Sequence, residues 1–154
     1  MKYYGLDTGI LGLICHPSKS PEILAAQEWL VNVRNLGNVV VIPEIADYEL
    51  RRELIRINSA PSLSALDRLS TELHYAPLST RIMRMAAELW ADSRKQGRIT
   101  APDTALDGDV ILCAQVISLS RDGEECIVAT TNIRHLGWFV DARDWTCIDP
   151  NVFG

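Results

Sequence analysis

The chain has 154 residues, 47% of them hydrophobic and 23% charged, which is typical of one globular domain with a substantial core. Its net charge of −5 argues against nucleic-acid binding through bulk positive charge, but not against a nucleic-acid enzyme whose acidic groups surround metal ions. No apolar stretch approaches the roughly 20 residues of a membrane span, and no signal peptide is evident, so we expect a cytoplasmic protein without a membrane partner.

Short apolar runs rich in Val, Ile and Tyr predict strands that are buried on both faces. They cover residues 2–6, 39–42, 75–78, 126–130 and 145–148. Amphipathic patterns predict helices over residues 20–36, 43–58, 61–73, 79–96 and 107–121, with a long loop over 97–106. Because strands and helices alternate, we predict a single α/β domain over residues 1–154. It is expected to be a three-layer α/β/α sandwich with a central parallel sheet of about five strands.

Acidic and small polar residues follow the predicted strands or open the helices next to them. Asp7 follows the first strand, Glu44 and Glu49 come after the second, Asp107 and Asp109 open the helix before the fourth, and Thr130 and Asn132 follow the fourth. Ligands of parallel α/β folds bind at the carboxyl ends of the strands. We therefore expect these side chains to gather at one edge of the sheet.

Two interpretations of the acids remain open from the residues alone. Asp is a preferred N-cap, so Asp7, Asp107 and Asp109 could each do no more than cap a helix. Several carboxylates at the same edge would repel one another, however, and a fold keeps them together most readily around a divalent cation.

Other site types fit less well. The tripeptide Asp7-Thr8-Gly9 also occurs in aspartic proteases, but those are all-β proteins that need two copies. The cysteines Cys15, Cys113, Cys126 and Cys147 lie far apart in apolar surroundings, so we expect them to be reduced and buried. No spacing of histidine and cysteine predicts a zinc site. The arginine and lysine clusters are expected to lie on solvated helix faces.

Four segments in order resemble the motifs of the PIN-domain family, and in particular its VapC-like toxins. They are GLDTGIL (5–11), IADYELRREL (45–54), LDGDVILCAQ (106–115) and VATTNIRHL (128–136), so that the resemblance covers almost the whole chain. It implies a parallel-sheet α/β/α fold and a ribonuclease that depends on Mg²⁺ or Mn²⁺. It also implies an RNA substrate, a homodimer and an antitoxin protein as partner.

The resemblance assigns roles to individual residues. Asp7, Glu49 and Asp109 match the catalytic acids, with Glu44 as a rival of Glu49, and Asp107 is an extra acid that could join Asp7 and Asp109 as a metal ligand. Supporting roles fall to Thr8, Thr130 and Asn132, and substrate contacts to Arg134 and His135.

One departure from the family pattern keeps a second function open. Many PIN domains carry a fourth acid after the fourth strand, where this chain has Asn132 and His135. The leading hypothesis is a metal-dependent endoribonuclease that hydrolyses RNA phosphodiester bonds, as the toxin of a toxin–antitoxin pair would. The alternative is a PIN-fold binding module with weakened catalysis that acts through RNA or protein contacts.

Overall fold

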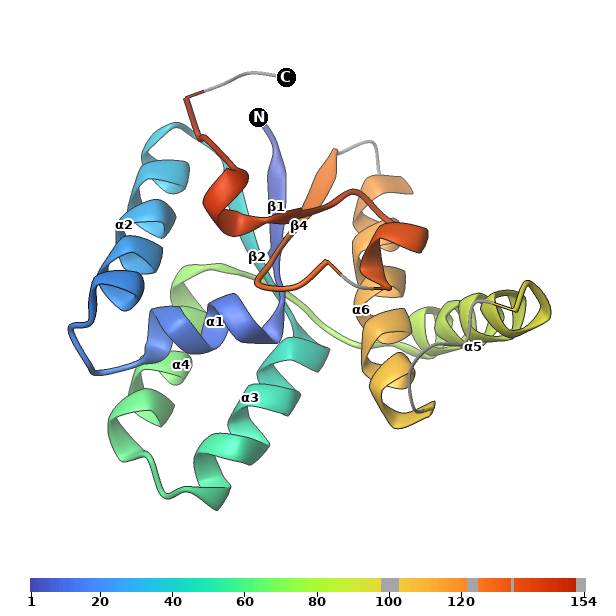
Figure 1. Ribbon diagram of the computed structural model, residues 1–154, viewed down its shortest axis with the longest axis horizontal. Helices are drawn as coiled ribbons and strands as arrows, with labels where there is room; N and C mark the ends of the chain where they lie inside the picture. Colours follow the sequence, from blue (N-terminus) through green and yellow to red (C-terminus); the bar gives the residue numbers. More distant parts are fainter. Residues whose placement is uncertain (98–102, 122–124, 134, 152–154) are drawn as a thin grey trace.

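A parallel five-stranded sheet forms the centre of the molecule, as seen in the computed structural model, which describes residues 1–97, 103–121, 125–133 and 135–151 (Figure 1). The order of the strands is β3-β2-β1-β4-β5, and every neighbouring pair is parallel. The strands are β1 (Tyr3–Leu6), β2 (Val39–Pro43), β3 (His74–Ala76), β4 (Cys126–Thr130) and β5 (Ala142–Asp144). The predicted central parallel sheet is confirmed.

Helices follow most of the strands. They are α1 (Thr8–Cys15), α2 (Pro21–Asn35), α3 (Glu44–Arg56), α4 (Ala60–Glu72), α5 (Thr80–Lys95) and α6 (Asp103–Arg121), with short 3₁₀ turns η1 (Leu136–Trp138) and η2 (Trp145–Cys147). Serine hydroxyls cap two of these helices: Ser20 accepts a hydrogen bond from the Ile23 N–H, and Ser79 accepts one from the Ile82 N–H. The predicted helices therefore exist, with ends that differ by a few residues.

Alternate residues of β4 show why the fold has three layers. Ile127 and Ala129 belong to the core packed beneath α1, α2 and α4, whereas Cys126 and Val128 belong to the core packed beneath α6. Successive side chains of a strand point to opposite faces, so both faces of the sheet are covered. In Figure 1, α1, α2, α3 and α4 lie on one side of the strands, and α6 with α5 lies on the other.

The last strand lies earlier in the chain than predicted. Residues 145–148 were expected to be extended, but residues Trp145–Cys147 form η2 and the strand covers Ala142–Asp144. The Asp144 carboxylate accepts hydrogen bonds from the N–H and hydroxyl of Thr146, and these bonds turn the chain. Trp145 and Ile148 are buried three residues apart, which is the period of a 3₁₀ turn rather than of a strand.

Helix α6 begins earlier than the helix predicted for this part of the chain. Residues 107–121 were expected to form it, with 97–106 as a loop, but α6 begins at Asp103. Residues 98–102 lie outside the described part of the chain. Asp107 and Asp109 consequently lie within the helix rather than at its start.

Two smaller expectations can also be compared with the structure. Cys15, Cys113 and Cys126 are free and buried as predicted, but Cys147 is exposed. No helix in the described ranges is long and apolar enough to cross a membrane.

Candidate functional site

Asp7 occupies the junction between β1 and α1. It caps α1, because its Oδ1 accepts a hydrogen bond of 2.8 Å from the N–H of Thr8. Its other oxygen, Oδ2, accepts a hydrogen bond of 2.7 Å from the hydroxyl of Thr130 at the end of β4. The interpretation of Asp7 as a helix cap is therefore correct but incomplete, since the same carboxylate also joins two neighbouring strand ends.

The loop after β4 lies against the start of α1. The Thr130 side chain is fully buried, and its hydroxyl also accepts a hydrogen bond of 3.0 Å from the Asn132 N–H. A Cβ added at Gly9 would lie only 2.3 Å from Oγ1 of Thr131. Gly9 thus allows the loop after β4 to approach the first turn of α1 closely, which gives the glycine of the Asp7-Thr8-Gly9 tripeptide a steric role that the sequence alone did not reveal.

Glu49 reaches the same edge of the sheet from the second turn of α3. Its Oε1 accepts a hydrogen bond of 3.2 Å from the Thr8 hydroxyl. Burial raises the pKa of the Glu49 carboxyl, the hydrogen bond from Thr8 lowers it, and the negative charge of Asp7 raises it further. The net shift is upward. Asp7 and Glu49 are therefore close enough to repel each other.

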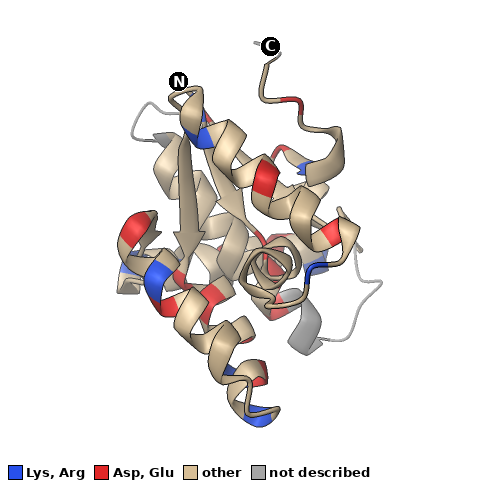
Figure 2. Ribbon diagram, turned by 90° about the vertical axis from the view of Figure 1, so that its left-hand side faces the viewer, with Lys and Arg blue, Asp and Glu red and all other residues tan. Residues whose placement is uncertain are grey.

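Glu49 also lies against α6. A Cβ added at Gly108 would lie 2.9 Å from Oε2 of Glu49, so the carboxylate almost touches the backbone between Asp107 and Asp109. Figure 2 shows that the acidic positions, in red, include a group near the lower ends of the strands and the helices that begin there. The structure thus brings segments from β1, α3 and α6 together at one edge.

Glu44, the rival of Glu49, is engaged elsewhere. Its Oε1 accepts a hydrogen bond of 2.7 Å from the backbone N–H of Leu78, in the segment that connects β3 to α5. A carboxylate held in this way stabilises the chain connection. The geometry therefore favours Glu49 over Glu44 as the acid of this helix at the site.

Asp107 and Asp109 are not helix caps, because α6 begins at Asp103. Asp107 is exposed and borders a pocket together with Glu49. Asp109 is partly buried. Burial raises the pKa of the Cys113 thiol, and the negative charges of Asp109 and Asp7 raise it further. Asp109 and Asp7 therefore approach the same buried cysteine from two different elements.

The oxygen donors at this edge suit a hard divalent cation in their chemistry, since Asp and Glu carboxylates are the usual protein ligands of Mg²⁺ and Mn²⁺. Burial raises the pKa of Glu49 most, and the nearby charge of Asp7 raises it further, as expected where two carboxylates lie close together. Over the described ranges, however, no three His, Cys, Asp or Glu side chains are arranged closely enough to hold a metal ion. The carboxylate oxygens suit such an ion chemically, but in this structure they do not surround a common point.

The two predicted substrate contacts remain untested. Arg134 lies outside the described residues. His135 is partly buried, and its ring lies 4.6 Å from that of Trp138, centroid to centroid. This packing gives His135 a structural neighbour, and its contact with substrate stays a prediction.

Buried polar residues that the sequence did not single out fix the helices around the site. Gln115 is almost fully buried in α6; its Oε1 accepts a hydrogen bond of 3.2 Å from the Ile45 N–H, and its Nε2 donates one of 2.7 Å to the Ala76 carbonyl. It therefore ties α6 to the start of α3, the helix that carries Glu49. A glutamine within an apolar helical run is the one signal that could have revealed this role.

A second such group involves Asp47, which is buried one turn before Arg51 in α3. Asp47 accepts hydrogen bonds of 2.9 Å from Nε of Arg51 and 2.6 Å from the Tyr75 hydroxyl, and Arg51 also bonds to Asp67. Arg51 was expected on a solvated helix face together with Arg52 and Arg56. It instead joins α3 to α4, while Asp47 joins α3 to β3.

No family model and no curated protein matches this chain. Solved structures do match it. VapBC2 from Rickettsia felis, bound to a DNA fragment from its promoter, has a TM-score of 0.69 at 16% identity and covers 93% of this chain and 98% of its own. FitAcB from Neisseria gonorrhoeae has a TM-score of 0.65 at 16% identity, covering 94% and 99%. VapBC-1 from nontypeable Haemophilus influenzae has a TM-score of 0.64 at 18% identity, covering 94% and 98%.

These similarities extend over almost the whole of this chain and of each matched chain. They are similarities of fold. They confirm the predicted resemblance at that level: the chain has a PIN-like α/β/α fold with a five-stranded parallel sheet.

Proposed function

We propose that this protein is a metal-dependent endoribonuclease that hydrolyses RNA phosphodiester bonds. One observation carries the proposal: Glu49 from α3 accepts a hydrogen bond from Thr8, next to Asp7, and lies against Gly108, between Asp107 and Asp109. Acids from three separate segments thus meet where ligands bind in parallel α/β folds. The PIN-like fold supports this reading of the edge.

Each residue has a defined part in this proposal. Asp7, Asp109 and Asp107 would bind Mg²⁺ or Mn²⁺, which when bound neutralises phosphate oxygens and lowers the pKa of a water molecule. Thr130 orients Asp7 through its 2.7 Å hydrogen bond, and Thr8 orients Glu49. Glu49, with its raised pKa, is suited to accept a proton near the attacked phosphate.

The proposed setting is that of a toxin in a toxin–antitoxin pair. Two of the structures with the same fold are VapBC2 and VapBC-1. By this likeness we propose a cytoplasmic protein that acts on RNA, forms a homodimer and is bound by an antitoxin protein.

A second candidate function is favoured by Asn132. This residue follows β4, where a fourth carboxylate is expected of many PIN domains, and it is exposed. A neutral amide is a weaker ligand for a divalent cation than a carboxylate. The second candidate is therefore a PIN-fold binding module with weakened catalysis.

Cleavage of a mixed RNA pool tests the proposal. Wild type is expected to cut RNA in Mn²⁺ and not in EDTA, and Asp7→Asn is expected to lose this activity while staying folded, because Asn also caps helices well. Asp92→Asn, the same change at an exposed position of α5, is the control and should cut as wild type does.

Thermal unfolding supplies a second readout. A ligand at 100 times its Kd stabilises the folded state by about 2.7 kcal/mol, and Asp7→Asn should lose most of this gain from Mn²⁺. Equal cleavage in EDTA and Mn²⁺ would contradict the proposal. RNA binding without cleavage, in a wild type that Mn²⁺ does not stabilise, would favour the binding module.

A further inference from the structure

A pocket of about 270 Å³ lies between α3 and α6, directly beside the acidic edge. It is lined by Ile45, Tyr48, Glu49, Arg52, Asp107, Gly108 and Ile111. Three of these residues belong to the acidic site already described, whereas Tyr48, Arg52 and the two isoleucines have no part in the proposed chemistry. The pocket therefore extends the site between α3 and α6.

Tyr48 and Arg52 lie against each other at this pocket. The Arg52 guanidinium lies 5.1 Å from the centre of the Tyr48 ring, in a cation–π contact between residues one helical turn apart. Tyr48 is 56% exposed, so part of its ring is accessible to another molecule. Ile45 is buried, so the pocket combines an apolar side chain with an accessible aromatic ring.

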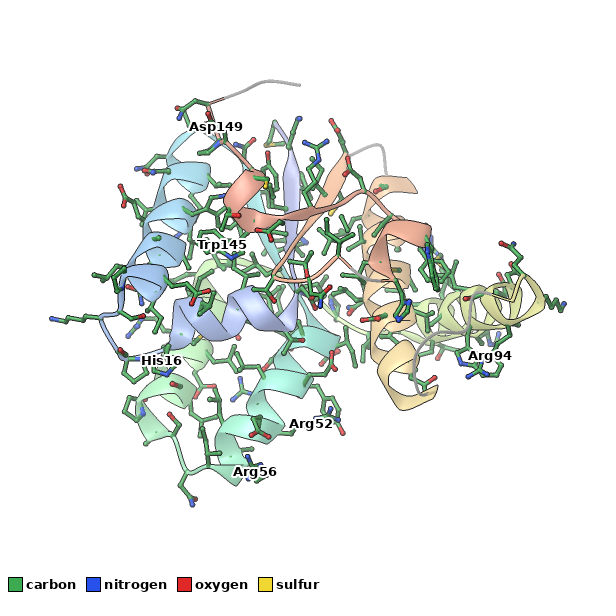
Figure 3. All side chains as sticks on the ribbon, viewed as in Figure 1. His16, Arg52, Arg56, Arg94, Trp145 and Asp149 are labelled. Atoms are coloured by element: carbon green, nitrogen blue, oxygen red, sulfur yellow. The ribbon has the colours of Figure 1, made fainter. Side chains whose placement is uncertain are left out.

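The neighbouring arginines of α3 are neutralised within the protein, whereas Arg52 borders the pocket. Arg51 forms ion pairs with Asp47 and Asp67, and Arg56 forms one with Glu53. Figure 3 shows Arg52 and Arg56 on α3, with Arg56 nearer the end of the helix. Arg52 therefore places a positive charge beside an aromatic ring, in a pocket that Glu49 and Asp107 also line.

A segment of single-stranded RNA matches this combination. Bases stack on exposed aromatic rings and on guanidinium planes regardless of sequence, and arginine pairs with phosphate oxygens. We propose that the pocket is a nucleobase subsite, in which one base stacks on Tyr48 and Arg52 contacts an adjoining phosphate. The next phosphodiester would then lie at the acidic edge, where a divalent cation would offset the negative charges of Glu49 and Asp107. This inference rests on the proposed ribonuclease function and adds the residues that position its substrate.

Binding of a fluorescently labelled single-stranded RNA in EDTA tests the subsite without cleavage. Tyr48→Ala should weaken binding about 5- to 100-fold, the range expected for the loss of one base–aromatic stack. Tyr48→Phe keeps the ring and should bind within about twofold of wild type. Ile55→Ala removes an exposed apolar side chain of the same helix that lies outside the pocket lining, and should have no effect.

Arginine variants separate the pocket from overall charge. Arg52→Gln and Arg56→Gln make the same change of charge on the same helix, but only Arg52 lines the pocket. Arg52→Gln should weaken RNA binding several-fold more than Arg56→Gln, and it should reduce the salt dependence of binding by about one phosphate contact.

Two results would overturn the subsite. One is wild-type RNA affinity in both Tyr48→Ala and Arg52→Gln, which would leave the pocket as a surface for a protein partner; the other is an equal loss in Arg52→Gln and Arg56→Gln. Cleavage in Mn²⁺ is measured in parallel. If wild type binds RNA through Tyr48 but never cuts it, the proposed nuclease activity is wrong and the subsite stands. If wild type cuts RNA and Tyr48→Ala changes neither binding nor cleavage, the nuclease stands and the subsite is wrong.

Discussion

The carboxylate of Glu49 lies so close to Gly108 that a Cβ at position 108 would be 2.9 Å from Oε2 and 3.3 Å from Cδ of Glu49. Gly108 lies within α6, where glycine costs about 1 kcal/mol of helix stability relative to alanine. Its neighbours in the chain are Asp107 and Asp109. The glycine therefore weakens its helix at the place where the Glu49 carboxylate from α3 meets the acids of α6.

Gly108→Ala is expected to separate folding from function. The new methyl group would meet the end of a flexible side chain, so Glu49 can move aside, and the free energy of unfolding should be unchanged or rise by up to about 1 kcal/mol. Displacing Glu49 should lower metal affinity and RNA cleavage about 10- to 100-fold, as changes next to metal ligands do. Chemical denaturation and Mn²⁺-dependent cleavage measure the two effects.

Gly12→Ala is the matched control for this change. Gly12 lies within α1, and a Cβ there would make an ordinary contact of 3.5 Å with Leu50. The variant should gain similar stability and cleave RNA as wild type does. A Gly108→Ala protein with full activity would show that the contact between Glu49 and α6 is not needed for cleavage.

The stability of the metal-free protein should depend on the ionisation of Glu49. Because the pKa of Glu49 is raised on folding, its contribution to stability is fully present below the pKa of the unfolded chain, near 4.5, and is lost as the pH rises through the higher folded value. Glu49→Gln removes the charge and keeps an oxygen for the Thr8 hydroxyl. In EDTA, the melting temperature of Glu49→Gln relative to wild type should therefore increase from pH 4 to pH 7.

Metal should reverse this order at pH 7. Mn²⁺ is expected to stabilise wild type more than Glu49→Gln, because the neutral amide no longer completes the group of acids. A difference between the two proteins that stays constant with pH in EDTA would mean that the burial of Glu49 costs nothing in its ionised form.

How far the sequence predicted the structure depends on the range of the interactions involved. Strands such as β1 and β4 are continuous apolar runs, and the buried faces of the helices repeat with the helical period, so their positions follow from local pattern. Residues 145–148 were wrongly predicted to be a strand, because a 3₁₀ turn with buried residues three apart resembles a short apolar strand in sequence. The start of α6 was wrongly predicted at residue 107, because Asp107 and Asp109 resemble helix caps in sequence.

The acids of the candidate site could be proposed from the sequence, whereas the contacts around them could not. Asp7, Glu49 and Asp109 were chosen from their places after strands and on helices and from the motifs. The close approach of Gly9 to Thr131 and the bridge formed by Gln115 join residues far apart in the chain. No local pattern encodes such contacts, because they depend on how the loops and helices pack.

Thr130 should contribute to stability through its bond to Asp7. Thr130→Val keeps the shape of the fully buried side chain and removes the hydroxyl that donates to Asp7 Oδ2. Loss of a hydrogen bond to a charged group costs about 1.5–3 kcal/mol, so urea denaturation should show a decrease of this order. Thr130→Ser keeps the donor and should lose less, whereas equal losses in the two variants would assign the effect to packing.

Asn132→Asp tests whether the residue after β4 faces the metal. The Asn132 N–H donates to the Thr130 hydroxyl, which in turn donates to Asp7, so Asn132 is two hydrogen bonds away from the proposed ligand. A carboxylate at this position should supply the fourth acid of the family pattern and tighten Mn²⁺ binding at least several-fold, because affinity for hard cations rises with ligand charge. In EDTA the added charge should lower the melting temperature, since it lies near Asp7.

Asn38→Asp is the control for this change. Asn38 immediately precedes β2, at the amino end of the sheet, and its side chain accepts a hydrogen bond from the Lys2 N–H, as an aspartate also would. Isothermal titration calorimetry with Mn²⁺ should show a gain for Asn132→Asp and none for Asn38→Asp. A folded Asn132→Asp protein that binds Mn²⁺ no better than wild type would place Asn132 outside the metal site.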